Sequence, residues 1–238
     1  MPNWCQNRLE INGPEEAIAK IAQACRVPDG EFDFNGIVPM PSELDITSGS
    51  STHWAYDVLY GDWQDVRSHR AETLLSLFGS LPESREEMID MIERAPACYE
   101  HKSANPFWLD LREGRQARAN EERFGVRDWY DWRIRHWGTK WNADSVGVDN
   151  LSGNNLTLWF ATAWSPPIPV VEALCEQYPD VSAAMDYIET GAWFAGTVRG
   201  EGGQIEDEPA SDIRAFGEDV FGMEFDAEED EPEEEAAS

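Results

Sequence analysis

The chain has 238 residues, with 47 acidic and 18 basic side chains and a formal net charge of −29. This length suits one domain with a sizeable core, or a smaller core that carries a large insertion. No apolar run approaches the roughly 18 residues that a membrane span requires, so we expect no membrane partner. Because the first residues lack the pattern of a secretory signal, we expect a cytoplasmic location.

The N-terminal residues are predicted to form a strand and then a helix. Alternating residues place one side of the strand against a core: Cys5, Asn7, Leu9 and Ile11. Pro14 begins the helix, at a position where its missing N–H costs little. Residues 32–41 are expected to be a short extended piece closed by two prolines.

The middle of the chain is predicted to be a mostly helical insertion. Residues 71–80 carry a short apolar stripe. Ser84 and Glu87 have the spacing of a capping box at the start of a helix over residues 84–95. Residues 112–125 are polar nearly all round, so this helix packs on one narrow face or projects.

The C-terminal half alternates more regularly. Residues 156–164 read as a strong strand, and the Pro-rich residues 165–169 break it and start a helix. Further strands are expected at residues 145–148, 181–189 and 192–199, and a last amphipathic helix at about 209–222. This order predicts an α+β fold, the split βαβ arrangement of a ferredoxin-like antiparallel sheet, with helices on one face and one extra strand.

The predicted domain organisation is discontinuous. Residues 1–41 and 142–200 form the ferredoxin-like core, and residues 42–141 form the helical insertion. Residues 201–225 hold the C-terminal helix. Residues 226–238 contain eight acids and no base, which predicts a disordered acidic tail.

Four segments of the sequence are similar to a known family. They are MPNWCQNRLEING at residues 1–13, IVPMP at 37–41, HWGTKWNA at 136–143 and TAWSPPIPVVEAL at 162–174. In these segments the chain resembles the YubB-like proteins of plasmids, phages and integrated elements. The resemblance implies a ferredoxin-like domain and a mobile-element origin, and it implies no activity. The acidic residues after about position 200 depart from it.

The negative charge is concentrated at the C-terminal end. Residues 201–238 hold 16 acids and a single base, Arg214. We predict an acidic interaction surface there, formed by Glu206, Asp207, Glu208, Asp212, Glu218, Asp219, Glu228, Glu229, Asp230 and Glu231. A tail that serves only solubility is the alternative. Either way, repulsion disfavours direct binding of nucleic acid by the tail.

Aromatic and cationic residues interleave over residues 126–144. Flat rings beside cations suit base stacking combined with phosphate recognition. We take as a candidate binding cleft Arg133, Arg135, His136, Trp137, Lys140, Trp141, Trp4 and Asn7. The competing interpretation is that these tryptophans form the seam between insertion and sheet, with the arginines reaching to water.

Motifs for catalysis or metal binding are weak. No phosphate-binding loop, nucleophile elbow or zinc-protease motif occurs. Cysteines 5, 25, 98 and 175 lack metal-site spacing and are expected to be free thiols, most of them buried. His136 is the best single acid–base candidate. We predict no cofactor, no metal and no catalytic residue.

Three functions remain open from the sequence. The first is a non-enzymatic accessory protein that binds a basic, nucleic-acid-binding host protein. Such a protein could mimic nucleic acid and inhibit a defence system of the anti-CRISPR or anti-restriction type. The second is a nucleotide-binding protein or enzyme that uses residues 126–144. The third is a purely structural module of a larger assembly. The oligomeric state does not follow from the sequence.

Overall fold

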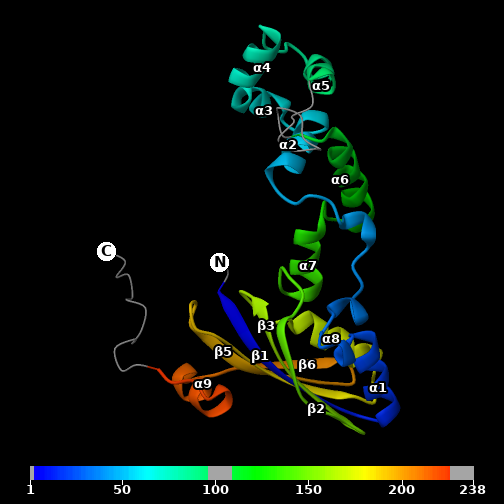
Figure 1. Cartoon of the computed structure of the whole chain (residues 1–238), viewed down its shortest axis with the longest axis vertical. Helices are drawn as coiled ribbons and strands as arrows, with labels where there is room; N and C mark the ends of the chain where they lie inside the picture. Colours follow the sequence, from blue (N-terminus) through cyan, green and yellow to red (C-terminus); the bar gives the residue numbers. More distant parts are fainter. Residues whose placement is uncertain (1–2, 96–108, 226–238) are drawn as a thin grey trace. The chain divides into compact units, whose positions relative to one another are not determined.

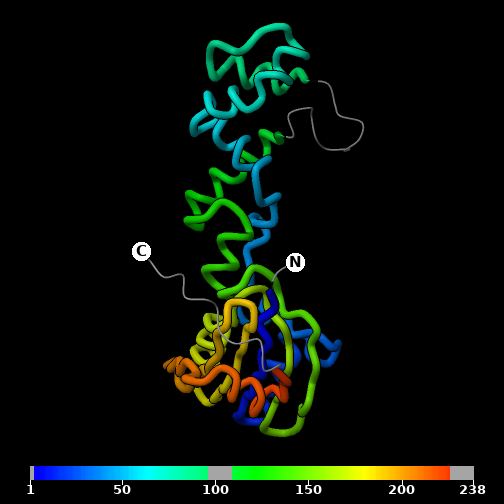
Figure 2. The backbone as a smooth tube through the Cα atoms, turned by 90° about the vertical axis from the view of Figure 1, so that its left-hand side faces the viewer, coloured from blue at the N-terminus to red at the C-terminus, as the bar shows by residue number. Residues whose placement is uncertain are grey.

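A computed structural model of the chain describes residues 3–95 and 109–225 (Figure 1). The chain divides into two compact units, one formed by Met1–Pro39 with Arg135–Ser238 and the other by Met40–Ile134. We call them the sheet unit and the helical unit. The chain passes from the sheet unit into the helical unit once and returns once, as the tube in Figure 2 traces.

The sheet unit contains a six-stranded sheet in which all neighbouring strands are antiparallel. The strands are β1 (Trp4–Asn12), β2 (Asp144–Ser152), β3 (Asn155–Ala163), β4 (Ser182–Glu189), β5 (Phe194–Glu201) and β6 (Gln204–Pro209). The order across the sheet is β2-β3-β1-β4-β5-β6. Its first four positions are those of a split βαβ core, so the predicted ferredoxin-like fold is confirmed. The sheet has two additional strands, where we expected one.

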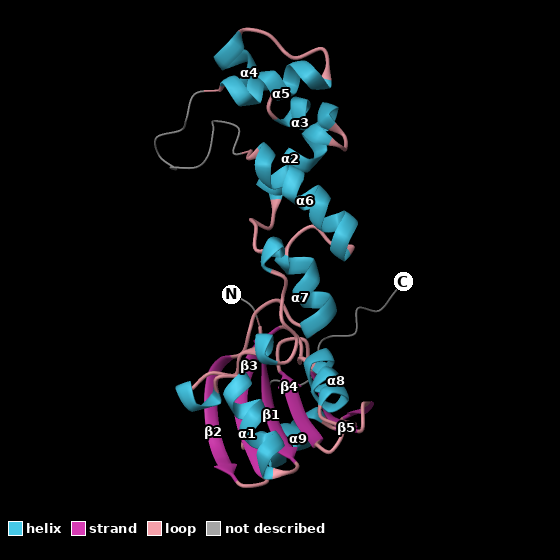
Figure 3. Cartoon of the chain, turned by 90° about the vertical axis from the view of Figure 1, so that its right-hand side faces the viewer, coloured by secondary structure: helices cyan, strands magenta, loops and turns pink. Residues whose placement is uncertain are grey.

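The central pairing follows the predicted alternation. Leu9 on β1 lies between Leu158 on β3 and Met185 on β4, and all three are buried. They belong to the first face of the sheet, which is covered by α1 (Glu15–Ala24) and α8 (Ile168–Gln177). Figure 3 shows these two helices on the same side of the strands. The core of the unit therefore lies between the first face and this helix pair.

The second face of the sheet has a different cover. The helix α9 (Ile213–Phe221) packs there over one end, where Gly217 lies against Ile188 and the Phe221 ring meets Trp159. A side chain at position 217 would collide with Phe225, so the close approach of this helix depends on the glycine. The helices of the split βαβ core share one face as predicted, but α9 lies on the opposite one.

The helical unit is built from short helices, as predicted for the insertion. They are α2 (Ser50–Leu59), α3 (Trp63–His69), α4 (Ala71–Phe78), α5 (Arg85–Arg94), α6 (Leu111–Phe124) and the first part of α7 (Trp129–Trp137). A Cβ on Gly114 would lie 2.8 Å from the backbone of Ala55, so this glycine lets α6 pack closely on α2. The otherwise polar α6 packs on one narrow face, as expected.

The predicted capping box at the start of α5 is present in modified form. The Ser84 hydroxyl accepts a hydrogen bond from the Glu87 N–H over 3.2 Å. The Glu87 carboxylate accepts from the Glu83 N–H, one residue before the expected partner. Met88 and Met91 then face the buried cluster of the helical unit. Side-chain capping and an apolar stripe together explain why this segment is helical.

Three local predictions need correction. Residues 32–41 are not extended, because Phe34–Gly36 forms a 3₁₀ turn capped by the Asp33 carboxylate. Two further 3₁₀ turns are Val27–Asp29 and Ser42–Leu44. Residues 201–225 hold β6 as well as a helix, which starts at Ile213 rather than near residue 209. The predicted tail at residues 226–238 lies outside the described residues.

Candidate functional site

Two of the predicted cleft residues belong to the core of the sheet unit. Trp137 is fully buried, its ring contacts Phe34, and its indole N–H donates to the carbonyl of Val38 over 2.9 Å. Asn7 is also fully buried on the first face of β1. Its amide donates to Thr162 Oγ1 over 2.9 Å and to the Cys5 carbonyl over 3.0 Å. Because both side chains are buried, the prediction that they line a cleft is wrong. Both act in packing.

A second group of predicted residues does gather at the surface of the sheet unit. Lys140 Nζ lies 4.2 Å from the ring centre of Trp141 and 4.5 Å from that of Trp164. Trp141 in turn packs on Trp4 with ring centres 6.0 Å apart. We call these four residues the tryptophan cluster. The sequence pattern predicted Trp4, Lys140 and Trp141 as site residues, but not Trp164.

Trp164 connects the cluster to the end of β3. Its backbone N–H donates to the Asn3 carbonyl over 3.0 Å, one step beyond the Trp4–Ala163 pair of the ladder. Trp164 is 43% exposed, and its backbone φ is +68°. A left-handed conformation is unfavourable for so bulky a residue, so the surrounding contacts hold it there. A signal was present in the sequence, because an aromatic residue directly before Ser-Pro-Pro falls where the strand ends.

The remaining predicted cleft residues lie on α7. Arg133 stacks over the Trp129 ring, 4.9 Å from its centre, within the helical unit. Arg135 is exposed, and His136 is half-buried. Burial, with the nearby Arg135 charge, lowers the pKa of His136 below its usual value. The imidazole is therefore largely neutral at pH 7 and contributes little positive charge.

The described residues of the predicted acidic surface lie on β6 and on or next to α9. Glu206 and Glu208 point to the second face of the sheet, and Glu208 lies 3.5 Å from Arg199. Asp207 points to the opposite face and accepts a hydrogen bond from the Tyr187 hydroxyl over 2.8 Å. Asp212 caps α9 by accepting from the Ala215 N–H. Residues 228–231 are outside the described part of the chain.

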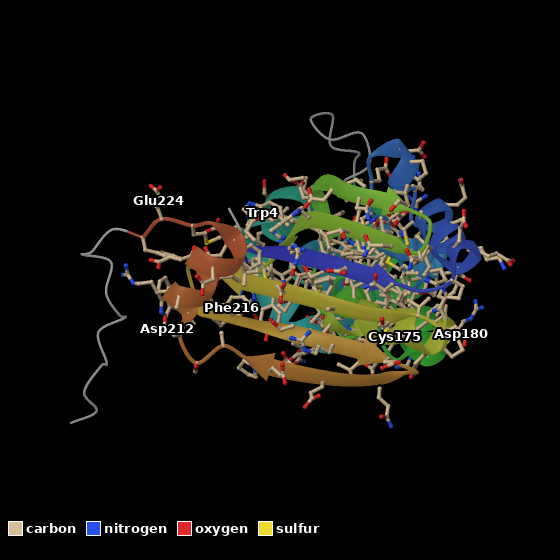
Figure 4. The ribbon with its side chains drawn as sticks, turned by 90° about the horizontal axis from the view of Figure 1, so that it is seen from below. Trp4, Cys175, Asp180, Asp212, Phe216 and Glu224 are labelled. Carbon is tan, nitrogen blue, oxygen red and sulfur yellow. The ribbon has the colours of Figure 1, made fainter. Side chains whose placement is uncertain are left out.

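The last turn of α9 is acidic. Glu218 and Asp219 are exposed there, Glu224 follows the helix, and no basic residue lies in that turn. The C-terminal end of a helix carries a partial negative charge, so carboxylates in this turn are disfavoured. Figure 4 shows Asp212 and Glu224 at one end of the sheet unit and Asp180 at the other.

Among the residues the structure describes, we next consider metal ligands and cysteine thiols. No group of three His, Cys, Asp or Glu side chains there is placed to hold a metal ion. Cys5, Cys25 and Cys175 are buried free thiols, as expected, and burial raises their pKa to about 12, 12 and 11. Cys98 lies outside the described residues. Across the described segments, the helices are too short or too polar to cross a membrane.

One family model and one solved structure are similar to this chain. Residues 136–234 match the family model for the ferredoxin-like domain in Api92-like protein. The crystal structure of protein api92 from Yersinia pseudotuberculosis aligns with 89% of this chain and 100% of its own, at 15% sequence identity and a TM-score of 0.38. No curated protein sequence matches. The family match agrees with the predicted ferredoxin-like domain and carries no activity.

Proposed function

We propose that this chain is a non-enzymatic binding protein, which engages a basic surface of another protein through the carboxylates of β6 and α9. These carboxylates continue in sequence into the acidic residues 226–238. Opposite charge on two partners speeds their encounter and orients them. The partner is therefore defined by its chemistry, as a protein with a cluster of exposed arginines and lysines.

The distribution of charge supports this proposal. The described part of the sheet unit, residues 3–39 and 135–225, carries 21 acidic and 7 basic side chains. In the helical unit, local ion pairs offset many of the acids, as with Arg127 and Glu121 at 3.1 Å or Arg123 and Glu43 at 2.7 Å. The uncompensated charge thus concentrates in the sheet unit, and most densely after residue 200.

The placement of Glu218 and Asp219 carries the proposal furthest. Both are exposed in the last turn of α9, where the helix dipole works against a negative charge. A sequence selected only for stability would place a base or a neutral residue there. Functional residues commonly carry a cost in stability. We therefore assign these two carboxylates to the interaction surface.

We further propose that the partner binds nucleic acid and that the chain originates from a mobile element. A surface of closely spaced carboxylates can imitate the phosphates of nucleic acid, which favours a nucleic-acid-binding partner. The resemblance to YubB-like plasmid and phage proteins suggests a host defence complex of the restriction or CRISPR type. The alternative, a nucleotide site on residues 126–144, has less support because Trp137 in that segment is fully buried.

The test compares two variants with equal charge changes. One carries Glu218→Gln, Asp219→Asn and Glu224→Gln. The control carries Glu172→Gln, Glu176→Gln and Asp180→Asn, which are also exposed. Each full-length protein is used to capture partners from a host lysate at about 50 and 500 mM salt. We expect the wild type and the control to retain the same basic protein at low salt only, and the first variant to lose it. Equal capture by both variants would contradict the proposal.

A further inference from the structure

We propose that the tryptophan cluster is a binding site for a cationic side chain, most favourably an arginine, that a basic partner inserts. The inference rests on the proposed function, because it names a contact that the partner would make. In the free protein Lys140 occupies this site. The partner's guanidinium would replace the lysine ammonium between the rings of Trp141 and Trp164.

The chemistry of the site is that of a cation receptor. The face of an indole ring carries partial negative charge, and Trp binds cations better than Tyr or Phe does. Two indole faces already hold one ammonium group at 4.2 and 4.5 Å, which lies within the 6 Å range of such contacts. In the described part of the chain, no carboxylate forms an ion pair with Lys140. The rings are therefore its principal partners.

The site is held in position before any ligand arrives. Thr139 donates to the Ala163 carbonyl over 2.9 Å, and Ser165 donates to the Gly138 carbonyl over 2.6 Å. These two bonds fix the segment that carries Lys140 against the end of β3. Trp164 is held in a left-handed conformation and still exposes 43% of its surface. Burial alone does not account for that arrangement, whereas presentation of an aromatic face does.

Charge decides between a cationic and an anionic ligand. The sheet unit carries three acids for each base, so its field attracts cations and repels phosphates. Lys140 can leave the site easily, since its flexible side chain reaches water by rotation. A planar guanidinium stacks on an indole and is more weakly hydrated than an ammonium, so arginine is the favoured replacement.

The experiment opens the site by removing its resident cation. Argininamide is titrated into the full-length wild type, Lys140→Ser and Lys20→Ser, and the indole N–H signals are followed by NMR. Lys20 is an exposed lysine paired with Glu16, so its loss changes the net charge equally. We expect Lys140→Ser to bind argininamide about two- to fivefold more tightly than wild type. Lys20→Ser should match the wild type, and adding Trp164→Leu to Lys140→Ser should abolish the gain.

Two results would overturn the inference. One is equal binding by Lys140→Ser and Lys20→Ser. The other is weaker binding of argininamide by Lys140→Ser than by wild type. In that case a parallel titration with AMP tests for a nucleotide site, which AMP binding to the wild type but not to Lys140→Ser would indicate. Because Trp141→Leu should act like Trp164→Leu, a folding defect in one tryptophan variant leaves the test intact. The titration uses no partner protein, so its outcome is independent of capture by the α9 carboxylates.

Discussion

The hydroxyl of Tyr187 donates a hydrogen bond to the carboxylate of Asp207 over 2.8 Å. Tyr187 is buried on the first face of the sheet, and burial, reinforced by the Asp207 carboxylate, raises the pKa of its phenol. The phenol therefore stays protonated and remains a donor. Among the acids of β6, Asp207 thus has a structural partner in the core, whereas Glu206 and Glu208 face the opposite side.

This difference predicts unequal effects of substitution within one strand. Asp207→Ala leaves the Tyr187 hydroxyl without its acceptor and should lower the free energy of unfolding by about 1–3 kcal/mol. Glu206→Ala, on the other face of the same strand, should change it by less than about 0.5 kcal/mol. Urea denaturation followed by circular dichroism measures both. Equal losses for the two variants would show that the hydrogen bond contributes nothing specific.

A second prediction concerns the polar group inside the sheet. Asn7 donates to the carbonyls of Cys5 and Phe160 and to the Thr162 hydroxyl. Asn7→Ala removes a donor that is shared by several buried acceptors, so we expect a loss of about 1–3 kcal/mol of stability. The neighbouring exposed Gln6 gives the control, because Gln6→Ala should alter stability by less than about 0.5 kcal/mol. If Asn7→Ala unfolds at the wild-type urea concentration, the packing role assigned to Asn7 is wrong.

Asn7 also shows what the sequence can and cannot reveal about the site. The alternation of β1 already placed Asn7 with Leu9 on the apolar face, so its burial followed from the pattern. Its amide nevertheless suggested a role in binding a ligand. Only the position of Thr162 on the adjacent strand supplies the partner that makes the residue structural. Trp137 is similar, because its partner, the Val38 carbonyl, is far away in the sequence.

The fold was more predictable than the site, because local alternation specifies a ferredoxin-like order without long-range information. β6 was not predicted, and the reason is physical. Its residues are nearly all exposed, with Ile205 only partly buried, so no alternation marks it. The strand forms because β5 offers an unpaired edge, and an acidic, proline-ended edge strand then discourages further pairing. Trp164 was not predicted as a site residue because its place in the tryptophan cluster depends on the conformation of the turn.

A third prediction concerns pH. Burial opposes ionisation of Asp33, but hydrogen bonds from Asn35 and Asn142, with the Arg26 charge, lower its pKa below the usual value of 3.8. The ionised carboxylate therefore stabilises the fold above the unfolded-state pKa, and this contribution is lost as the pH falls through the folded-state pKa.

Asp33→Asn tests this dependence. We expect the variant to be less stable than wild type at pH 7 and pH 5, by the same amount at both. The difference should shrink as the pH falls below about 4, because the wild-type carboxyl then becomes protonated as well. Thermal unfolding across this range provides the measurement. A difference that persists undiminished at pH 2 would exclude the ionised Asp33 as its source.

The last prediction separates the stability of α9 from its proposed role. Glu218 and Asp219 lie at the negative end of the helix dipole, so Glu218→Gln and Asp219→Asn should each raise the free energy of unfolding by about 0.3–1 kcal/mol at low salt. The gain should diminish at high salt, since the dipole interaction is screened. Asp212→Asn, at the opposite end of the same helix, serves as the control. Its carboxylate caps the helix and favours the dipole, so this variant should not be stabilised. Thermal unfolding at two salt concentrations distinguishes these outcomes.

If the α9 variants were no more stable than wild type, Glu218 and Asp219 would carry no stability cost. Their assignment to an interaction surface would then lose its main support.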